Sequence, residues 1–140
     1  MLSLKKIFER IILEIGTGHK IWLNFKTGKH IEIDKNDLHW SFVRDNLNLF
    51  GLDTEENISD EQIEEKGWIA AYFDSKYLSF RTFQKNDKMI HAVQDFINKR
   101  NIKPYVVFFD VFGEVTKSSY KVPYDDFMQA DKYSDLRQFL

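Results

Sequence analysis

The hydrophobic positions near the N-terminus repeat with the period of a helix. Apolar side chains recur three and four positions apart, at Ile7, Phe8, Ile11, Ile12 and Ile15. Lysine, arginine and glutamate occupy the other face. This spacing predicts an amphipathic helix over about residues 3–15 that ends at Gly16. A short helix of mixed charge packs on its own sheet more often than on an anionic membrane, so we expect packing on the sheet.

Three later stretches change to the two-residue period of β-strands. In each stretch two alternating segments flank a turn, which predicts a β-hairpin, and a helical pattern follows each hairpin. We therefore expect an α+β fold with an antiparallel sheet in a single domain, residues 1–140. The sheet would be built from three hairpin–helix units after the leading helix, over about residues 21–51, 67–101 and 105–140.

Turn residues set the register that we expect in the first hairpin. A three-residue loop, Lys26-Thr27-Gly28 with the glycine in the left-handed conformation, places Leu23 opposite Ile31. A four-residue loop would set Leu23 against Glu32. Burial of one face fixes the register of a strand pair, so we expect the three-residue loop.

The same reasoning predicts the register of the other two hairpins. It places Tyr72 opposite Leu78 in the second hairpin and Asp110 opposite Lys117 in the third. Asp110 is an acid in a strongly apolar run, and pairing with Lys117 accounts for it. In this register the core face of the third hairpin carries Tyr105, Val107, Phe109 and Val111.

A pair of short polar residues follows each hairpin: Asn36-Asp37, Asn86-Asp87 and Asp125-Asp126. Side-chain oxygens of Asn and Asp accept hydrogen bonds from free amides in a first helical turn. The pairs predict helices over about residues 37–50, 88–100 and 126–132, the first two ended by Gly51 and Asn101. Because the spacing between pairs is unequal, the units are either weak repeats or separate solutions to one capping problem.

The region between the first two units, residues 52–66, is an acidic insertion. Ser59 and Gln62 have the spacing of a capping box, which predicts a short helix that ends by Gly67. The segment has no lysine or arginine before Lys66 and holds seven carboxylates: Asp53, Glu55, Glu56, Asp60, Glu61, Glu64 and Glu65. Such a run is either a solubilising loop or a surface that steers a basic partner.

Composition narrows the class of protein. Cysteine is absent, which excludes disulfides, thiolate nucleophiles and zinc–thiolate sites and suits a reducing compartment. The net charge is −2, so the whole molecule has no positive field for a phosphate backbone. No signal-peptide core and no membrane-spanning run occurs, so we expect a cytoplasmic location. Aromatic residues make up 16% of the chain, which predicts a core rich in rings.

Strong local enzyme signatures are missing from the sequence. His30, Glu32 and Asp34 alternate along one strand and share a face, as a metal site or an acid–base pair requires. In the expected register this face meets solvent, so a solvated strand is the favoured interpretation. The remaining histidines, at positions 19, 39 and 91, each stand alone, and we expect neither a cofactor nor a resident metal.

Single-stranded nucleic acid is a third possible ligand. Exposed Trp22, Trp68 or Tyr77 would stack bases, provided that a cationic groove lies beside them. Residues 5–29 offer six Lys or Arg against two acids, although the net acidity of the chain opposes this interpretation.

The sequence favours a protein that binds another protein rather than an enzyme. The leading hypothesis is an inhibitor or immunity-type protein that uses the seven carboxylates of the acidic insertion to mask a basic partner, such as a nuclease toxin. Two alternatives remain: a metal-binding or hydrolytic domain centred on His30, Glu32 and Asp34, and a single-strand nucleic-acid binding module.

Overall fold

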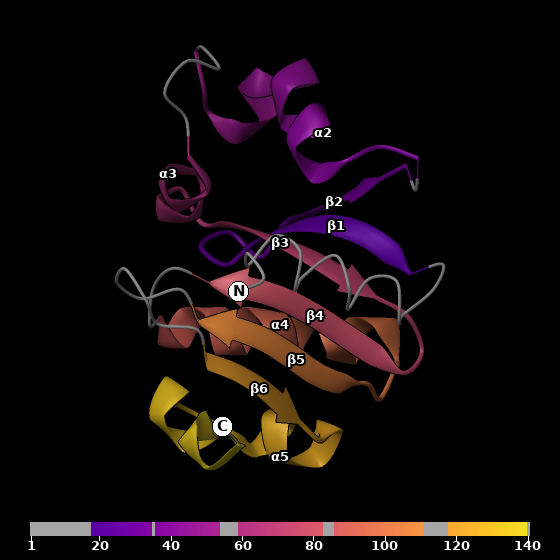
Figure 1. Ribbon diagram of the computed structural model, residues 1–140, viewed down its shortest axis with the longest axis vertical. Coiled ribbons are helices and arrows are strands. Elements are labelled where there is room, and N and C mark those ends of the chain that lie inside the picture. The colour runs from indigo at the N-terminus through magenta and orange to yellow at the C-terminus, as the bar shows by residue number, and fades with distance from the viewer. Residues whose placement is uncertain (1–17, 35, 54–58, 83–85, 111–117, 140) are drawn as a thin grey trace.

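Six strands form one mixed sheet in the described part of the chain, in the order β2-β1-β3-β4-β5-β6 (Figure 1). The computed structural model describes residues 18–34, 36–53, 59–82, 86–110 and 118–139. The predicted helix at 3–15 lies outside these residues. The strands are β1 (His19–Asn24), β2 (His30–Ile33), β3 (Trp68–Phe73), β4 (Tyr77–Thr82), β5 (Tyr105–Asp110) and β6 (Ser118–Val122).

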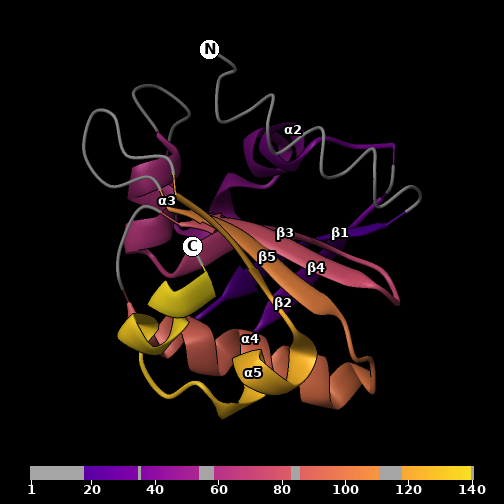
Figure 2. The same ribbon diagram turned by 60° about the horizontal axis from the view of Figure 1, so that its bottom comes forward.

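Helices pack on both sides of this sheet, which confirms the α+β class. Figure 2 shows α2 and α3 on one side and α4 and α5 on the other. None of the helices in the described ranges is both long and apolar enough to cross a bilayer. The α-helices are α2 (His39–Asp45), α3 (Asp60–Glu65), α4 (Asp87–Arg100) and α5 (Tyr124–Gln129), and the 3-10 helices are η1 (Leu47–Phe50) and η2 (Tyr133–Phe139).

The sheet is not wholly antiparallel as expected, because β4 and β5 run parallel, with Tyr77 beside Tyr105. Parallel neighbours need a crossover connection, which α4 provides. The three proposed units are also not equivalent, since α2 packs on the face opposite to α4 and α5 (Figure 2). The idea of three similar hairpin–helix units is therefore not confirmed.

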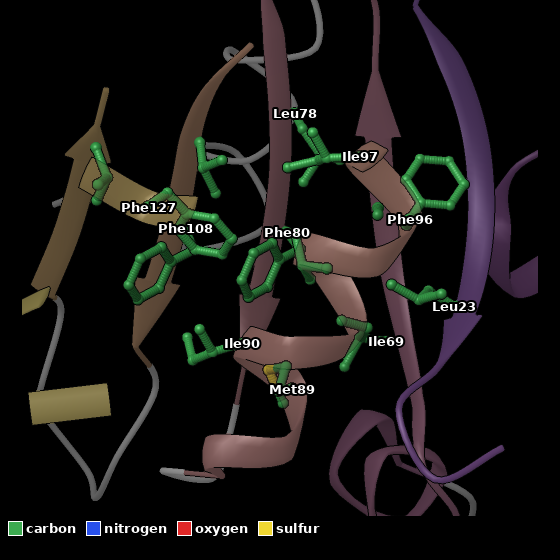
Figure 3. Close-up of a cluster of buried hydrophobic side chains, with 14 of the residues drawn as sticks. Leu23, Ile69, Leu78, Phe80, Met89, Ile90, Phe96, Ile97, Phe108 and Phe127 are labelled. Carbon is green, nitrogen blue, oxygen red and sulfur yellow. The ribbon is translucent and has the colours of Figure 1, made fainter. Parts of the chain in front are cut away.

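Two hydrophobic clusters lie on opposite faces of the central strands. The larger one joins α4, α5 and η2 to the sheet and includes stacked rings of Phe80 and Phe108, whose centroids are 5.2 Å apart (Figure 3). The smaller one joins α2, η1 and α3 to β1, β2 and β3 through Trp22, Phe50 and Ile63. Strand β3 consequently buries all six of its side chains.

The predicted register of the first hairpin is wrong by one residue. Leu23 pairs with His30, rather than with Ile31 or Glu32, and the turn occupies residues 25–28. Gly28 is left-handed as expected, with φ of 76°. The prediction assumed that β1 has one buried face, but Trp22 and Leu23 are both buried on opposite faces, so burial does not select the register.

The other two hairpins are also shifted by one residue, in the opposite sense. Leu78 pairs with Phe73 instead of Tyr72, and Asp110 pairs with Ser118. The buried face of β5 carries Val106 and Phe108, whereas Tyr105 is exposed and Val107 is half-buried. Strand β5 is apolar on both faces, so the alternation that marks a half-buried strand is missing.

The capping predictions are confirmed for two helices. The Asn86 side chain accepts from the amide of Lys88 at the start of α4, and Asn101 ends α4 with φ of 53°. Ser59 and Gln62 form the complete capping box of α3.

The predictions for the other two helices are wrong in detail. Helix α2 begins after Leu38, which makes no side-chain cap, and the expected helix 37–50 breaks at Asn46 into α2 and η1. Helix α5 begins after Pro123, so Asp125 and Asp126 lie in its first turn, where the helix dipole favours carboxylates. Gly51 does end η1 in the left-handed conformation.

We predict that Gly67→Ala destabilises the fold by about 2 kcal/mol or more, whereas Gly28→Ala costs about 1 kcal/mol. Both glycines have positive φ. A Cβ on Gly67 would also lie 2.5 Å from Asn24 Oδ1, which accepts from two backbone amides of the β1–β2 turn, while Gly28 has open space. Urea unfolding of both variants measures the difference, and equal losses would contradict the close approach.

Candidate protein-binding surface

The acidic insertion does not present all of its carboxylates outward. Glu55 and Glu56 lie outside the described residues, while Asp53, Glu61 and Glu65 are exposed. The two remaining acids face inward: Glu64 is only 2% exposed, and the carboxyl group of Asp60 pairs with Arg81 on β4. The expected outward surface of seven carboxylates is therefore smaller than the sequence suggested.

Asp60 holds α3 against the sheet. Besides the pair with Arg81, Asp60 Oδ1 accepts a hydrogen bond from Trp40 Nε1 at 2.5 Å, which ties α3 to α2. A cavity of about 10 Å³, room for roughly one water molecule, lies beside these groups and is lined also by Trp22, Trp68, Ile69 and Ala70. Asp60 and Glu64 share the helix face of buried Ile63, so their position follows from the helical period.

Asn24 and two lysines join the end of α3 to neighbouring segments. Asn24 Nδ2 donates to the carbonyl of Lys66 at 3.2 Å, and Lys26 Nζ donates to the carbonyl of Glu65 at 2.5 Å. The Lys66 ammonium lies 3.8 Å from the position of a Cβ on Gly51, so the ends of α3 and η1 meet. These contacts fix where the exposed carboxylates of α3 lie.

Charge is distributed unevenly along the chain. Residues 36–66, which we call the acidic end, hold nine acids and two bases, whereas the rest of the chain holds thirteen acids and eighteen bases. The exposed acids of this region include Asp37 and Asp45, which are not among the seven predicted carboxylates. The exposed charged residues in its described part are Asp37, Arg44, Asp45, Asp53, Glu61, Glu65 and Lys66.

A groove and two exposed leucines lie in the same region. The groove has a volume of about 370 Å³ and runs along the end of α2, η1 and the start of the insertion. Leu49 lines it and is 55% exposed, and Leu38, before α2, is 66% exposed. Neither leucine was predicted to be a candidate, since the sequence indicated a single helix over 37–50. The other lining residues are Arg44, Asp45, Asn46, Leu47, Asn48, Leu52 and Asp53.

His30 and Glu32 are exposed, as expected, but they lie beside the C-terminal end of α4 rather than on a bare face. His30 Nε2 accepts from Arg100 Nη2 at 3.2 Å. Glu32 lies between that guanidinium, at 3.8 Å, and His19 Nδ1, at 3.0 Å. The carboxylate of Asp34 instead accepts from the amide of Asn36.

This arrangement gives the metal-centred interpretation no geometric support. The Arg100 guanidinium donates a hydrogen bond to His30 Nε2, one of the two ring nitrogens through which a histidine binds a metal ion. Across the ranges that the structure describes, no group of three His, Asp or Glu side chains is placed to hold a metal ion.

His39 is structural rather than exposed. Its Nε2 donates to the carbonyl of Ile21 at 2.9 Å, and Tyr72 Oη donates to its Nδ1 at 2.9 Å. Burial lowers the pKa of His39 from 6.5 to about 4, so the ring is neutral in the folded protein. The Trp22 ring packs edge-on against it, and both residues attach α2 to β1.

Two of the three aromatic residues selected for base stacking are buried. Trp22 is 3% exposed and Trp68 is 8% exposed, because α2, η1 and α3 cover their face of the sheet. Tyr77 is half-buried. Stacking on Trp22 or Trp68 is therefore incompatible with this fold.

Comparison of the chain with protein-family models, with curated proteins and with solved structures gave no match. The geometry and charge of the acidic end are therefore the basis for a proposed function.

We predict that Arg81→Met destabilises the protein by about 1–3 kcal/mol, because it leaves the largely buried Asp60 carboxylate without this partner. Lys99→Met is the matched control, since Lys99 and Asp95 form an exposed pair at 2.9 Å within α4 that is worth about 0.5 kcal/mol at most. Urea unfolding compares the two variants. Equal, small losses would show that the Asp60–Arg81 pair does not anchor α3.

We also predict that stability falls on acidification because of His39. Its folded pKa, about 4, lies below the unfolded value of 6.5, so protonation favours the unfolded chain. The contribution is complete above pH 6.5 and is lost as the pH falls towards 4, an effect of at most about 3 kcal/mol. Urea unfolding at several pH values should show a flatter dependence in His39→Asn, whereas exposed His91→Asn should keep the wild-type slope. An unchanged slope in His39→Asn would refute this assignment.

Proposed function

We propose that this chain is a protein-binding domain whose acidic end covers a basic surface of a partner, as an inhibitor or immunity-type protein would. The observation that carries the proposal is the coincidence of three features at one end of the molecule. Exposed carboxylates, two exposed leucines and an open groove all belong to α2, η1, α3 and their connections. A nuclease toxin is one class of partner with the required basic surface.

Charge favours a cationic partner for this region. The acidic end carries seven more acids than bases, while the rest of the chain has an excess of bases. A local negative field of this kind steers a basic protein into the correct orientation and raises its association rate. Arg44 and Lys66 lie within the same surface and would restrict the partners that fit.

Leu49 supplies the apolar contact that charge alone lacks. Binding energy in protein interfaces is concentrated in a few desolvated side chains surrounded by a polar rim. Leu49 lines the groove together with Asp45 and Asp53, so an exposed apolar side chain and two carboxylates belong to one surface. A basic segment with an apolar or aromatic residue next to Lys or Arg matches this arrangement.

Rigid attachment of the acidic end to the sheet also favours binding. The Asp60–Arg81 pair and the buried His39 fix α3 and α2 before any partner arrives. Less conformational entropy is then lost on association. A cytoplasmic location, expected from the sequence, stays a prediction.

Selection of displayed random peptides of about ten residues on the full-length chain tests this proposal. We expect the selected peptides to be rich in Lys and Arg beside apolar residues. Their affinity should fall at least about tenfold in a variant that combines Leu49→Asp, Asp45→Lys and Asp53→Lys, because the apolar side chain and the two carboxylates of this surface are all lost. Calorimetry measures the affinities, and amide shifts should map binding to residues 36–66.

A matched control changes exposed acids elsewhere. Asp95→Lys with Asp131→Lys alters charge on the other side of the molecule and should leave the affinity within about twofold. Selected peptides without basic enrichment, or peptides that bind the triple variant and the wild type equally, would contradict the proposal.

A further inference from the structure

A second surface of different chemistry lies at the starts of β4 and β5. Tyr77 and Tyr105 are direct neighbours across these parallel strands, with ring centroids 6.1 Å apart and an angle of 34° between the rings. Their side chains point away from α4, since Leu78 and Val106 fill the face that α4 covers. Tyr105 is 45% exposed, which is unusual for an aromatic ring on a strand inside a sheet.

One lysine side chain lies over both rings, and two further lysines are close to them in the chain. The Lys121 ammonium, from the neighbouring strand β6, lies 5.1 Å from the ring centroid of Tyr105 and 5.6 Å from that of Tyr77. Lys76 precedes Tyr77, and its carbonyl accepts from the Tyr105 amide at 2.8 Å. Lys103 is exposed just before β5, and its ammonium lies 5.9 Å from the ring centroid of Tyr124 on α5. In Figure 1 the starts of β4 and β5 and the end of β6 lie at the same end of these neighbouring strands.

None of these three lysines has a carboxylate within ion-pair distance in the described part of the chain. Two acids are near these lysines in the sequence. Asp74 accepts hydrogen bonds from the backbone amides of Lys76 and Tyr77 in the β3–β4 turn, and Asp125 lies in the first turn of α5. Lys121 beside the two rings, and Lys76 and Lys103 just before the strands that carry them, therefore have charge to offer to an external anion.

We propose that this tyrosine–lysine patch, formed by Tyr77, Tyr105 and Lys121 with exposed Lys76 and Lys103 next to it in the chain, binds single-stranded nucleic acid. A base stacks on the exposed ring of Tyr105, and the lysines contact the flanking phosphates. Stacking is tolerant of sequence because every base has a flat aromatic face, and the lysines contact only the backbone. The site is thus suited to single strands, whose bases are free to stack, and not to a closed duplex.

Lys121 already lies over both rings, so a base has to displace its ammonium. An exposed cation–π contact strengthens an interaction about 2- to 5-fold, whereas stacking of a base on an aromatic side chain contributes about 5- to 100-fold. Displacement is therefore favourable. The ammonium that leaves the rings remains close enough to contact a phosphate of the same strand.

The patch corrects the earlier expectation for nucleic acid rather than repeating it. Of the aromatic residues considered, only Tyr77 belongs to it, and Trp22 and Trp68 are buried. The patch is also separate from the acidic end, which repels phosphate. Failure of one proposal therefore leaves the other intact.

Fluorescence anisotropy with labelled oligo(dT) of about 20 nucleotides tests the proposal on the full-length chain. We expect binding that weakens with salt, with a slope of log affinity against log salt near −2, as about three phosphate contacts predict. Tyr105→Leu should weaken binding at least about 5-fold, and Tyr105→Trp should restore it, because stacking needs an aromatic ring.

Charge is tested separately from stacking. Lys121→Gln should weaken binding at least about 3-fold and reduce the salt slope, whereas Lys29→Gln, in the exposed β1–β2 turn, removes the same charge elsewhere and should have little effect. An abasic strand of equal length should bind less tightly than oligo(dT).

Several results would overturn the proposal. It fails if oligo(dT) does not bind at about 50 mM salt, if Tyr105→Leu binds like the wild type, or if the abasic strand binds equally well. Tighter binding of a polyglutamate peptide of matched charge would instead assign the patch to an acidic protein. If oligo(dT) binding is lost only when the chain self-associates, the patch would instead be assigned to binding the acidic end of a second copy.

Discussion

Burial of both faces of the central strands is the constraint on which the rest of this structure depends. Trp22 and Leu23 are adjacent in β1 and both buried, and β3 buries all of its side chains. A sheet of this kind needs a layer of helices on each side. The acidic end is the layer that covers one side of β1 and β3, so its position is a consequence of folding and not of a flexible attachment.

The same constraint explains why the elements were predicted better than their pairing. Turn and cap signals are local: Gly28, Ser59 and Asn101 act through their own backbone or the adjacent turn, and each acts as expected. Register depends on which face is buried. In β1 and β5 both faces are apolar, so the sequence contains no alternation from which to choose between Val106 and Tyr105 as the core residue.

The parallel pairing of β4 and β5 could not be predicted for a related reason. A helix between two strands is compatible both with separate hairpins and with a crossover. The choice depends on whether α4 can lie across β4 and β5 and fill the gap above Phe80 and Phe108, which is a tertiary question. Hairpin patterns alone therefore led to an antiparallel sheet.

Composition pointed to the acidic insertion, and its role as a binding surface stays a prediction. Counting carboxylates did not separate exposed Glu61 from Asp60, although the helical period around Ile63 contained that information, since residues 60, 63 and 64 share a face. Leu49 was missed because its exposure follows from the break at Asn46, which no local signal marked.

Burying charged groups between α3 and the sheet costs desolvation free energy, so their presence calls for a reason other than stability. Apolar residues in place of Asp60, Glu64 and Arg81 would serve stability alone as well or better, because desolvation of charged groups offsets most of their attraction. Ionic contacts differ from apolar ones in being directional. The Asp60–Arg81 pair and the Trp40 hydrogen bond allow α3 one orientation on the sheet, and that orientation keeps Glu61 and Glu65 facing outward. Inward carboxylates thus determine where the outward ones can meet a partner.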